Sequence, residues 1–148
     1  MSIARKNAIT ALILWTLVLG GLIAAVLGPG VARFTAPDHS IWRLLVAVII
    51  LPGFGFHFWL LWRSKRGRRL GELDERDEAV ARQASEATLV VVAILVFSVS
   101  IALYETHFEG GTVPTGWLYL LAYGNMALVS LTHAAATLVL DLSGGVDG

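Results

Sequence analysis

The sequence predicts an all-α membrane protein: a single integral membrane domain with four transmembrane helices, a helical cytoplasmic loop and both termini in the cytoplasm. Three observations predict this fold class. Hydrophobic residues make up 56% of the 148 residues and charged residues only 15%, against roughly 25% charged residues in a typical soluble domain. Most of the sequence falls into four long apolar stretches, each close to the roughly 20 residues that cross a bilayer. The Lys and Arg residues are concentrated on one side of these stretches.

The first two spans are predicted at residues 9–28 and 41–62. The first contains no charged residue and is longer than the roughly 7–15 apolar residues of a signal peptide core, so we expect an uncleaved helix. The second has tryptophans near both ends, where their amphipathic rings prefer the membrane interface. Pro52 lies in its middle, and because proline removes a backbone donor it should kink the helix.

The other two spans are predicted at residues 87–104 and 117–140. The fourth is the most polar of the four, with Asn125 and His133 among its polar side chains. It is also rich in Gly and Ala, which allow helices to approach one another closely in lipid. We therefore expect the fourth span to be the one most covered by the rest of the protein.

The orientation of the spans follows from the positions of Lys and Arg. Cytoplasmic segments of membrane proteins carry the excess of these residues. Here one side has nine of them and the other side has two: Arg5, Lys6, Arg63, Lys65, Arg66, Arg68, Arg69, Arg76 and Arg82 against Arg33 and Arg43. This bias predicts a protein of the inner, cytoplasmic membrane whose termini and residues 63–86 lie in the cytoplasm.

The predicted cytoplasmic loop, residues 63–86, has a basic part followed by a mixed-charge part. Arg66, Arg68 and Arg69 belong to the basic part, which either only fixes the topology or contacts anionic membrane lipid or a partner, since juxtamembrane cations attract such lipids. Residues 74–88 contain no Gly or Pro and are rich in Ala, Glu and Arg, so they should be helical. This helix is expected to run into the third span.

The start of this helix resembles a known family. Its motif consists of Asp74-Glu75-Arg76-Asp77, Val80, Arg82 and Ala84. It is similar to that of a family of small prokaryotic membrane proteins, domain of unknown function 2178, in which hydrophobic hairpins flank an acidic–basic motif. The resemblance implies no activity, cofactor or catalytic residue. We expect Asp74, Arg76 and Asp77 to cap and orient the helix or to contact a protein partner.

Two histidines lie inside predicted spans at similar depth. His57 precedes Arg63 by six residues, which places it about 9 Å from the cytoplasmic end of its span at 1.5 Å per residue. His133 precedes Asp141 by eight residues, about 12 Å from the end of its span. Because lipid offers an imidazole no hydrogen-bonding partner, both rings should point into the bundle and face the same interior region.

Three interpretations of His57 and His133 remain open. Each ring is neutral and hydrogen-bonded across the bundle, or the two are axial ligands of one b-type haem with Gly53 leaving room for the macrocycle, or they take part in proton or metal traffic. We take His57 and His133 as the candidate cofactor-binding pair, with haem b as the alternative to no cofactor.

Composition and motifs disfavour most enzyme classes. The chain has no cysteine, so it has no disulfides or thiolate metal sites. It also lacks a phosphate-binding loop and a dinucleotide fingerprint. An enzyme is not expected, no catalytic residue is assigned, and no nucleic-acid partner is indicated. No metal site is assigned either, because acidic and histidine residues on loops are usually only solvated. Those on the predicted outer side are Asp38, His39, Glu105, His107 and Glu109.

Three functions therefore remain. The first is a non-catalytic accessory, regulatory or immunity-type protein that acts through helix packing and its cytoplasmic loop. The second is a bis-histidine haem-binding subunit for electron transfer. The third is a small oligomeric transporter or channel with the fourth span lining the path. The partners expected are membrane lipid, a protein bound at the cytoplasmic loop, and further copies of the chain in a homo-oligomer.

Overall fold

The computed structural model describes residues 3–34, 36, 40–69 and 75–143, without the side chains of residues 3, 61, 64, 65 and 67–69. Within these residues all regular structure is helical. The helices are α1 (Ile3–Leu27), α2 (Val31–Phe34), α3 (Ser40–Arg69), α4 (Glu75–His107) and α5 (Thr115–Ser143). Four of them, α1, α3, α4 and α5, are long and apolar enough to cross a membrane. The predicted all-α fold with four transmembrane helices is confirmed.

The helices extend beyond the predicted spans on the side of the charged connection. The basic part continues α3 as far as Arg69, and α3 runs through Pro52 as one helix. The mixed-charge part begins α4, which has 33 residues and is therefore about 50 Å long. A bilayer core is only about 30 Å thick, so one end of α4 projects from the membrane. Glu75, Asp77 and Glu78 occupy its first turn, where acidic groups favour the helix dipole.

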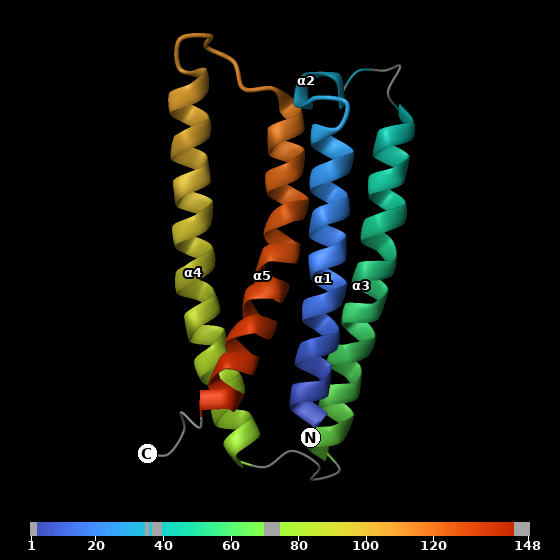
Figure 1. Cartoon of the computed structure of the whole chain (residues 1–148), viewed down its shortest axis with the longest axis vertical. Helices are drawn as coiled ribbons and strands as arrows, with labels where there is room; N and C mark the ends of the chain where they lie inside the picture. Colours follow the sequence, from blue (N-terminus) through green and yellow to red (C-terminus); the bar gives the residue numbers. More distant parts are fainter. Residues whose placement is uncertain (1–2, 35, 37–39, 70–74, 144–148) are drawn as a thin grey trace.

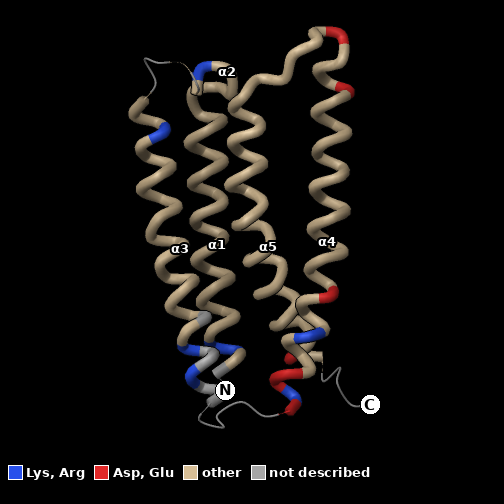
Figure 2. The backbone as a smooth tube through the Cα atoms, turned by 180° about the vertical axis from the view of Figure 1, so that it is seen from behind, with Lys and Arg blue, Asp and Glu red and all other residues tan. Residues whose placement is uncertain are grey.

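The four long helices lie side by side in a flat row with the order α4, α5, α1, α3 (Figures 1 and 2). Close contacts between long helices are concentrated in the neighbouring pairs α4–α5, α5–α1 and α1–α3. The start of α1, the end of α3, the start of α4 and the end of α5 share one end of the molecule, which we call the termini end. The short helix α2 lies at the opposite end, against α5, α1 and α3.

Two apolar clusters hold α1 to its neighbours. Nearer the opposite end, Leu22 and Val26 of α1 pack with Phe34 of α2 and with α3, and Phe34 meets the Tyr119 ring of α5 edge-on at 5.1 Å. Further towards the termini end, Trp15 packs in a second cluster that includes residues of α5. The core therefore follows α1.

The fourth predicted span, α5, is less buried within the protein than the sequence predicted. In the apolar window of α1, 28% of the residues are buried, against 17% for α5. The reason is that α5 leans towards α4 at the termini end and separates from it at the opposite end (Figure 1). Residues of α1, α4 and α5 line a cleft there. The prediction that α5 would be the most covered span is wrong.

Candidate functional site

His57 is held by a tryptophan of the neighbouring helix. The indole Nε1–H of Trp15 in α1 donates to Nδ1 of His57 in α3 at 3.3 Å, and the two rings meet edge-on with their centroids 5.5 Å apart. Trp15 is only 1% exposed and also contacts the Phe54 ring edge-on. The imidazole is thus fixed in orientation by a buried donor.

This hydrogen bond determines the chemistry that His57 can offer. An indole N–H can only donate, so Nδ1 acts as the acceptor and the neutral ring carries its proton on Nε2. A metal-bound neutral imidazole uses the lone pair of one nitrogen and keeps its proton on the other. In this arrangement the Nδ1 lone pair faces the indole and Nε2 holds the proton. His57 therefore has no nitrogen available for haem iron.

The space beside Gly53 is also filled. A Cβ built on Gly53 would lie 3.0 Å from Cγ2 of Val18 and 3.9 Å from the Trp15 ring. Gly53 therefore lies on the same face of α3 as His57, but α1 packs directly against that face. The residues around His57 do not fit a bound macrocycle at this position.

His133 lies in α5 at the crossing with α4. The backbone of Ala84, a fully buried residue of α4, lies near its side chain. The hydroxyl of Thr88 donates to the Ala84 carbonyl at 2.6 Å. Small side chains such as Ala84 and Ala134 allow two helices to cross closely in lipid. His133 therefore lies where α5 packs against α4.

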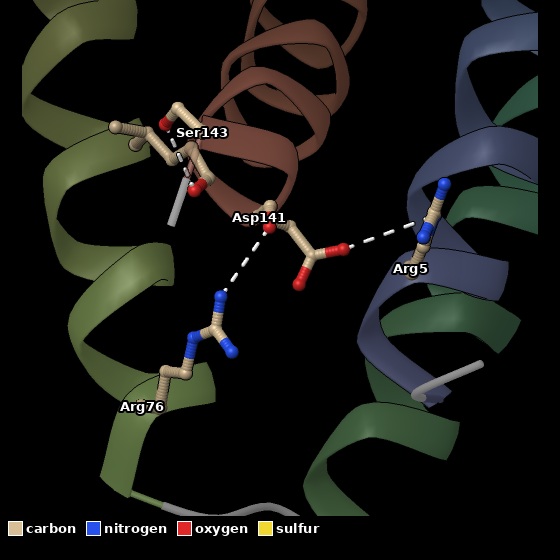
Figure 3. Close-up of polar contacts among 5 residues, drawn as sticks. Arg5, Arg76, Asp141 and Ser143 are labelled. Atoms are coloured by element: carbon tan, nitrogen blue, oxygen red, sulfur yellow. Dashed lines mark hydrogen bonds and ion pairs between the residues drawn. The ribbon is translucent and has the colours of Figure 1, made fainter. Parts of the chain in front are cut away.

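At the termini end, Asp141 joins three helices (Figure 3). Its carboxylate Oδ2 lies 3.8 Å from Nε of Arg5 in α1. Its backbone carbonyl accepts a hydrogen bond from Nη2 of Arg76 in α4 at 3.4 Å. Cations near the end of α5 also interact favourably with the negative end of its dipole. Arg76 of the acidic–basic motif is thus directed inward, to the end of α5.

The other predicted contact residues do not join this group. Arg66 is exposed, with its guanidinium 5.6 Å from the centre of the Trp62 ring. Arg68 and Arg69 lie in the last turn of α3, and their side chains are outside the described part of the chain. Asp77 is half-buried in the first turn of α4, and Asp74 is outside the described residues.

A basic groove of about 420 Å³ lies between α1 and α3 at the termini end. Lys6 and Arg63 line it, with Thr10 between them on its wall, and the Arg63 guanidinium lies 5.4 Å from the centre of the Trp59 ring. Two cations beside an interfacial tryptophan suit the phosphate of a lipid headgroup. Sequence reasoning missed this pairing, although Lys6 and Arg63 are the cations nearest the ends of two neighbouring spans.

An apolar cleft of about 240 Å³ lies in the other half of the molecule, between α1, α4 and α5. Asn125 is a polar exception in its apolar lining. It follows Trp117 by eight residues and so lies about 12 Å along α5 from that residue. No hydrogen bond joins its exposed side-chain amide to any of the residues that the structure describes.

Among the described residues, no group of three or more His, Asp or Glu side chains is placed to hold a metal ion. Nδ1 of His107 lies 3.0 Å from the Leu103 carbonyl oxygen of its own helix. Asp38 and His39 are outside the described residues.

Trp15 was not identified as a site residue from the sequence, although a signal was present. Tryptophan prefers the membrane interface, whereas Trp15 lies six residues inside the first predicted span, about 9 Å from its end. His57 lies at the same distance from the end of the second span. Matched depth in adjacent spans is the pattern that pairs an indole donor with an imidazole acceptor.

The chain matches a known protein family. A family model described as "Predicted membrane protein (DUF2178)" matches residues 6–140. No curated protein and no solved structure matches the chain. The match covers all four candidate spans almost completely, and it confirms the resemblance carried by the acidic–basic motif.

Proposed function

Because the chain belongs to this family of predicted membrane proteins of unknown function, we propose a role that its own residues support. The protein is a non-catalytic accessory or regulatory protein of the inner membrane, and it acts by binding a transmembrane helix of a partner protein. Both termini lie in the cytoplasm, since nine of the eleven Lys and Arg residues flank that side. The termini end is then the cytoplasmic end.

The observation that carries this proposal is Asn125 in the apolar cleft. Its amide has two donors and a carbonyl acceptor, and lipid tails can satisfy none of them. Polar side chains in this situation hydrogen-bond across helices, with about 0.6 kcal/mol per bond on average and about 1.7 at most. A partner helix that brings an amide or hydroxyl to the same depth would supply the missing bonds.

The lining of the cleft suits the same occupant. Leu95 and Val99 of α4 and Leu19 and Ile23 of α1 form apolar walls. Gly124 also lines the cleft, and a Cβ there would meet only Leu22, at 3.9 Å. Small residues at such a position let a second helix approach closely.

A non-catalytic role agrees with how the ionisable groups of the spans are used. His57 accepts from Trp15, and Asp141 is paired with Arg5. These groups stabilise helix packing rather than face a substrate. The haem alternative is not supported, because the hydrogen bond to Trp15 leaves His57 without a free ligand nitrogen.

The test is site-specific photo-cross-linking in the full chain within its native membrane. A photoreactive residue at Val99, which lines the cleft, should give one protein adduct that maps to an apolar segment of the partner. Asn125→Leu should abolish this adduct without lowering the stability of the protein, because Asn125 bonds to none of the described residues. Val129→Leu, on the same helix outside the cleft lining, should leave the adduct unchanged.

Two outcomes would overturn the proposal. Adducts with lipid alone would show that acyl chains fill the cleft. A protein adduct that Asn125→Leu does not change would show that the amide plays no part in recognition.

A further inference from the structure

The basic groove between α1 and α3 changes from charged to apolar along its length. Lys6 of α1 and Arg63 of α3 line it nearest the termini end, and both side chains are exposed. Thr10 and Trp59 line the next level, each four residues further from that end, or about 6 Å along its helix. Phe56 then continues the wall of α3, with its ring centre 5.1 Å from that of Trp59. A phospholipid has the same order of parts, a charged headgroup above apolar chains.

The charged side chains that line the groove are both positive. Neither α1 nor α3 contains an Asp or Glu, and the described acidic residues of the termini end lie on α4 and α5 (Figure 2). Asp141 of α5 pairs with Arg5 and not with Lys6. Within the described part of the chain, no acidic side chain forms an ion pair with Lys6 or Arg63. The groove therefore presents two cations whose charge this part of the chain does not neutralise.

Trp59 places Arg63 in a suitable position for a phosphate group. The guanidinium carbon of Arg63 lies 5.4 Å from the centre of the Trp59 ring. All five N–H donors of a guanidinium lie in its plane, so an arginine held against an aromatic face keeps an edge with which to bind phosphate through two hydrogen bonds. Lys6 adds a second cation from the other wall of the groove.

We propose that the basic groove binds one anionic phospholipid from the leaflet at the termini end. The headgroup phosphate lies between Lys6 and Arg63, and an acyl chain runs along Phe56. The groove volume of about 420 Å³ is within the range of about 300–1,000 Å³ that is usual for small-ligand sites. A zwitterionic phospholipid would bring its own cation to a groove that already has two, so charge favours an anionic headgroup. This site is separate from the apolar cleft between α1, α4 and α5, and it does not depend on the proposed function.

The test is a lipid titration of the purified full chain in detergent, followed by native mass spectrometry. One phosphatidylglycerol should bind at concentrations at which phosphatidylcholine with the same acyl chains does not. Lys6→Gln and Arg63→Gln should each weaken this binding about fivefold, the usual contribution of one cation near an anionic lipid surface. The double variant should weaken it by about 25-fold if the two contributions are independent.

The matched control removes two positive charges from the same end of the molecule but outside the groove. Arg66 lies over the Trp62 ring at 5.6 Å, much as Arg63 lies over Trp59, and Arg82 is an exposed residue of α4. Neither lines the groove. Arg66→Gln combined with Arg82→Gln should leave the affinity for phosphatidylglycerol unchanged.

A third variant keeps both cations and fills the groove. The exposed Thr10 hydroxyl donates only within its own helix, to the Lys6 carbonyl at 2.8 Å, so its loss should not impair folding. Thr10→Phe places a ring between the two walls and should abolish binding of phosphatidylglycerol. Attraction of lipid to surface charge alone would be unaffected by this change.

Four results would overturn the proposal. Equal binding of phosphatidylcholine would show that charge does not select the lipid. Equal weakening in the Arg66 and Arg82 control would show a diffuse attraction to the basic end, and binding retained in Thr10→Phe would place the lipid elsewhere. Displacement of the lipid by an equal concentration of inorganic phosphate would show a site for a free anion, because inorganic phosphate makes no use of the apolar wall.

Discussion

Replacing Trp15 by Phe tests whether the indole N–H, and not only ring packing, holds His57. The substitution keeps an aromatic ring, which can preserve the edge-on contact seen at 5.5 Å. It removes the donor that lies 3.3 Å from Nδ1 of His57. Since Trp15 is 1% exposed, water has little access to the imidazole nitrogen that loses its partner.

The magnitude follows from two terms. Phe has about three fewer ring atoms than Trp, so the substitution leaves a cavity of about 40 Å³, and at about 24 cal/mol per Å³ of cavity the lost packing costs about 1 kcal/mol. The lost hydrogen bond adds about 0.5–1.5 kcal/mol. The bond is longer than the usual N–H distance of about 2.9–3.0 Å, so the lower half of that range is expected. Trp15→Phe should therefore reduce the free energy of unfolding by about 1.5–2 kcal/mol.

A double-mutant cycle separates these terms. Trp15→Phe, His57→Phe and the double variant would be unfolded reversibly in mixed micelles by a denaturing detergent. We expect an interaction energy of about 0.5–1 kcal/mol, within the range of hydrogen bonds measured in membrane proteins. Trp62→Phe, an exposed tryptophan of α3, is the matched control and should change stability by less than about 0.5 kcal/mol.

Two results would refute this reasoning. The first is an interaction energy below about 0.3 kcal/mol, the level at which independent substitutions simply add. The second comes from nitrogen NMR of the labelled imidazole. Because the indole can only donate, the spectrum should show an unprotonated Nδ1 and a protonated Nε2, and the reverse tautomer would contradict the structure.

Two further predictions concern packing and topology. Gly116→Ala should destabilise the protein by about 1–3 kcal/mol, because a Cβ there would collide with the Val31 carbonyl oxygen and lie 2.8 Å from its Cγ1. Thermal unfolding checks this, with Gly124→Ala as the control that should be neutral or stabilising. A reporter after Gly148 or near Gly71 should give a cytoplasmic signal and one near Gly110 an external signal. An external signal near Gly71 would reverse the assigned orientation of every span.

The long helices could be predicted because four stretches of about 20 residues contain almost no charged residue, and in lipid such a stretch satisfies its backbone hydrogen bonds as a helix. The ends of the helices were harder to predict from the sequence, because the composition of residues 63–69 is compatible with a helical extension of α3 and with a loop. The order of the four long helices in the row could not be predicted from the sequence either. It depends on which faces pair, and Val46 and Val48 of α3 are equally apolar although the first is buried and the second exposed.

The candidate site could likewise be predicted only in part. Position along a helix gave the depth of His57 and His133 from the sequence alone, because each residue advances a helix by a fixed rise. Their neighbours could not be predicted in this way, because Trp15 and Ala84 belong to other helices, and position along one helix does not determine which helices lie side by side. Because Trp15 donates to its Nδ1, His57 is a hydrogen-bond acceptor and not the free metal ligand that the sequence suggested. Gly53 was expected to leave open space beside His57, but α1 packs closely against it.

The polar groups inside the spans differ in how readily the chain can satisfy them itself. A hydroxyl can donate to its own helix, as Thr16, Thr88 and Ser100 do. The imidazole of His57 has its partner on another helix, the indole of Trp15 in α1. The amide of Asn125 has more hydrogen-bonding positions than a hydroxyl and is placed where α4 has moved away from α5. The Asn125 amide is costly in lipid and does not help its own chain to pack, so contact with another molecule explains it best. The proposed function therefore rests on Asn125 and not on the histidines.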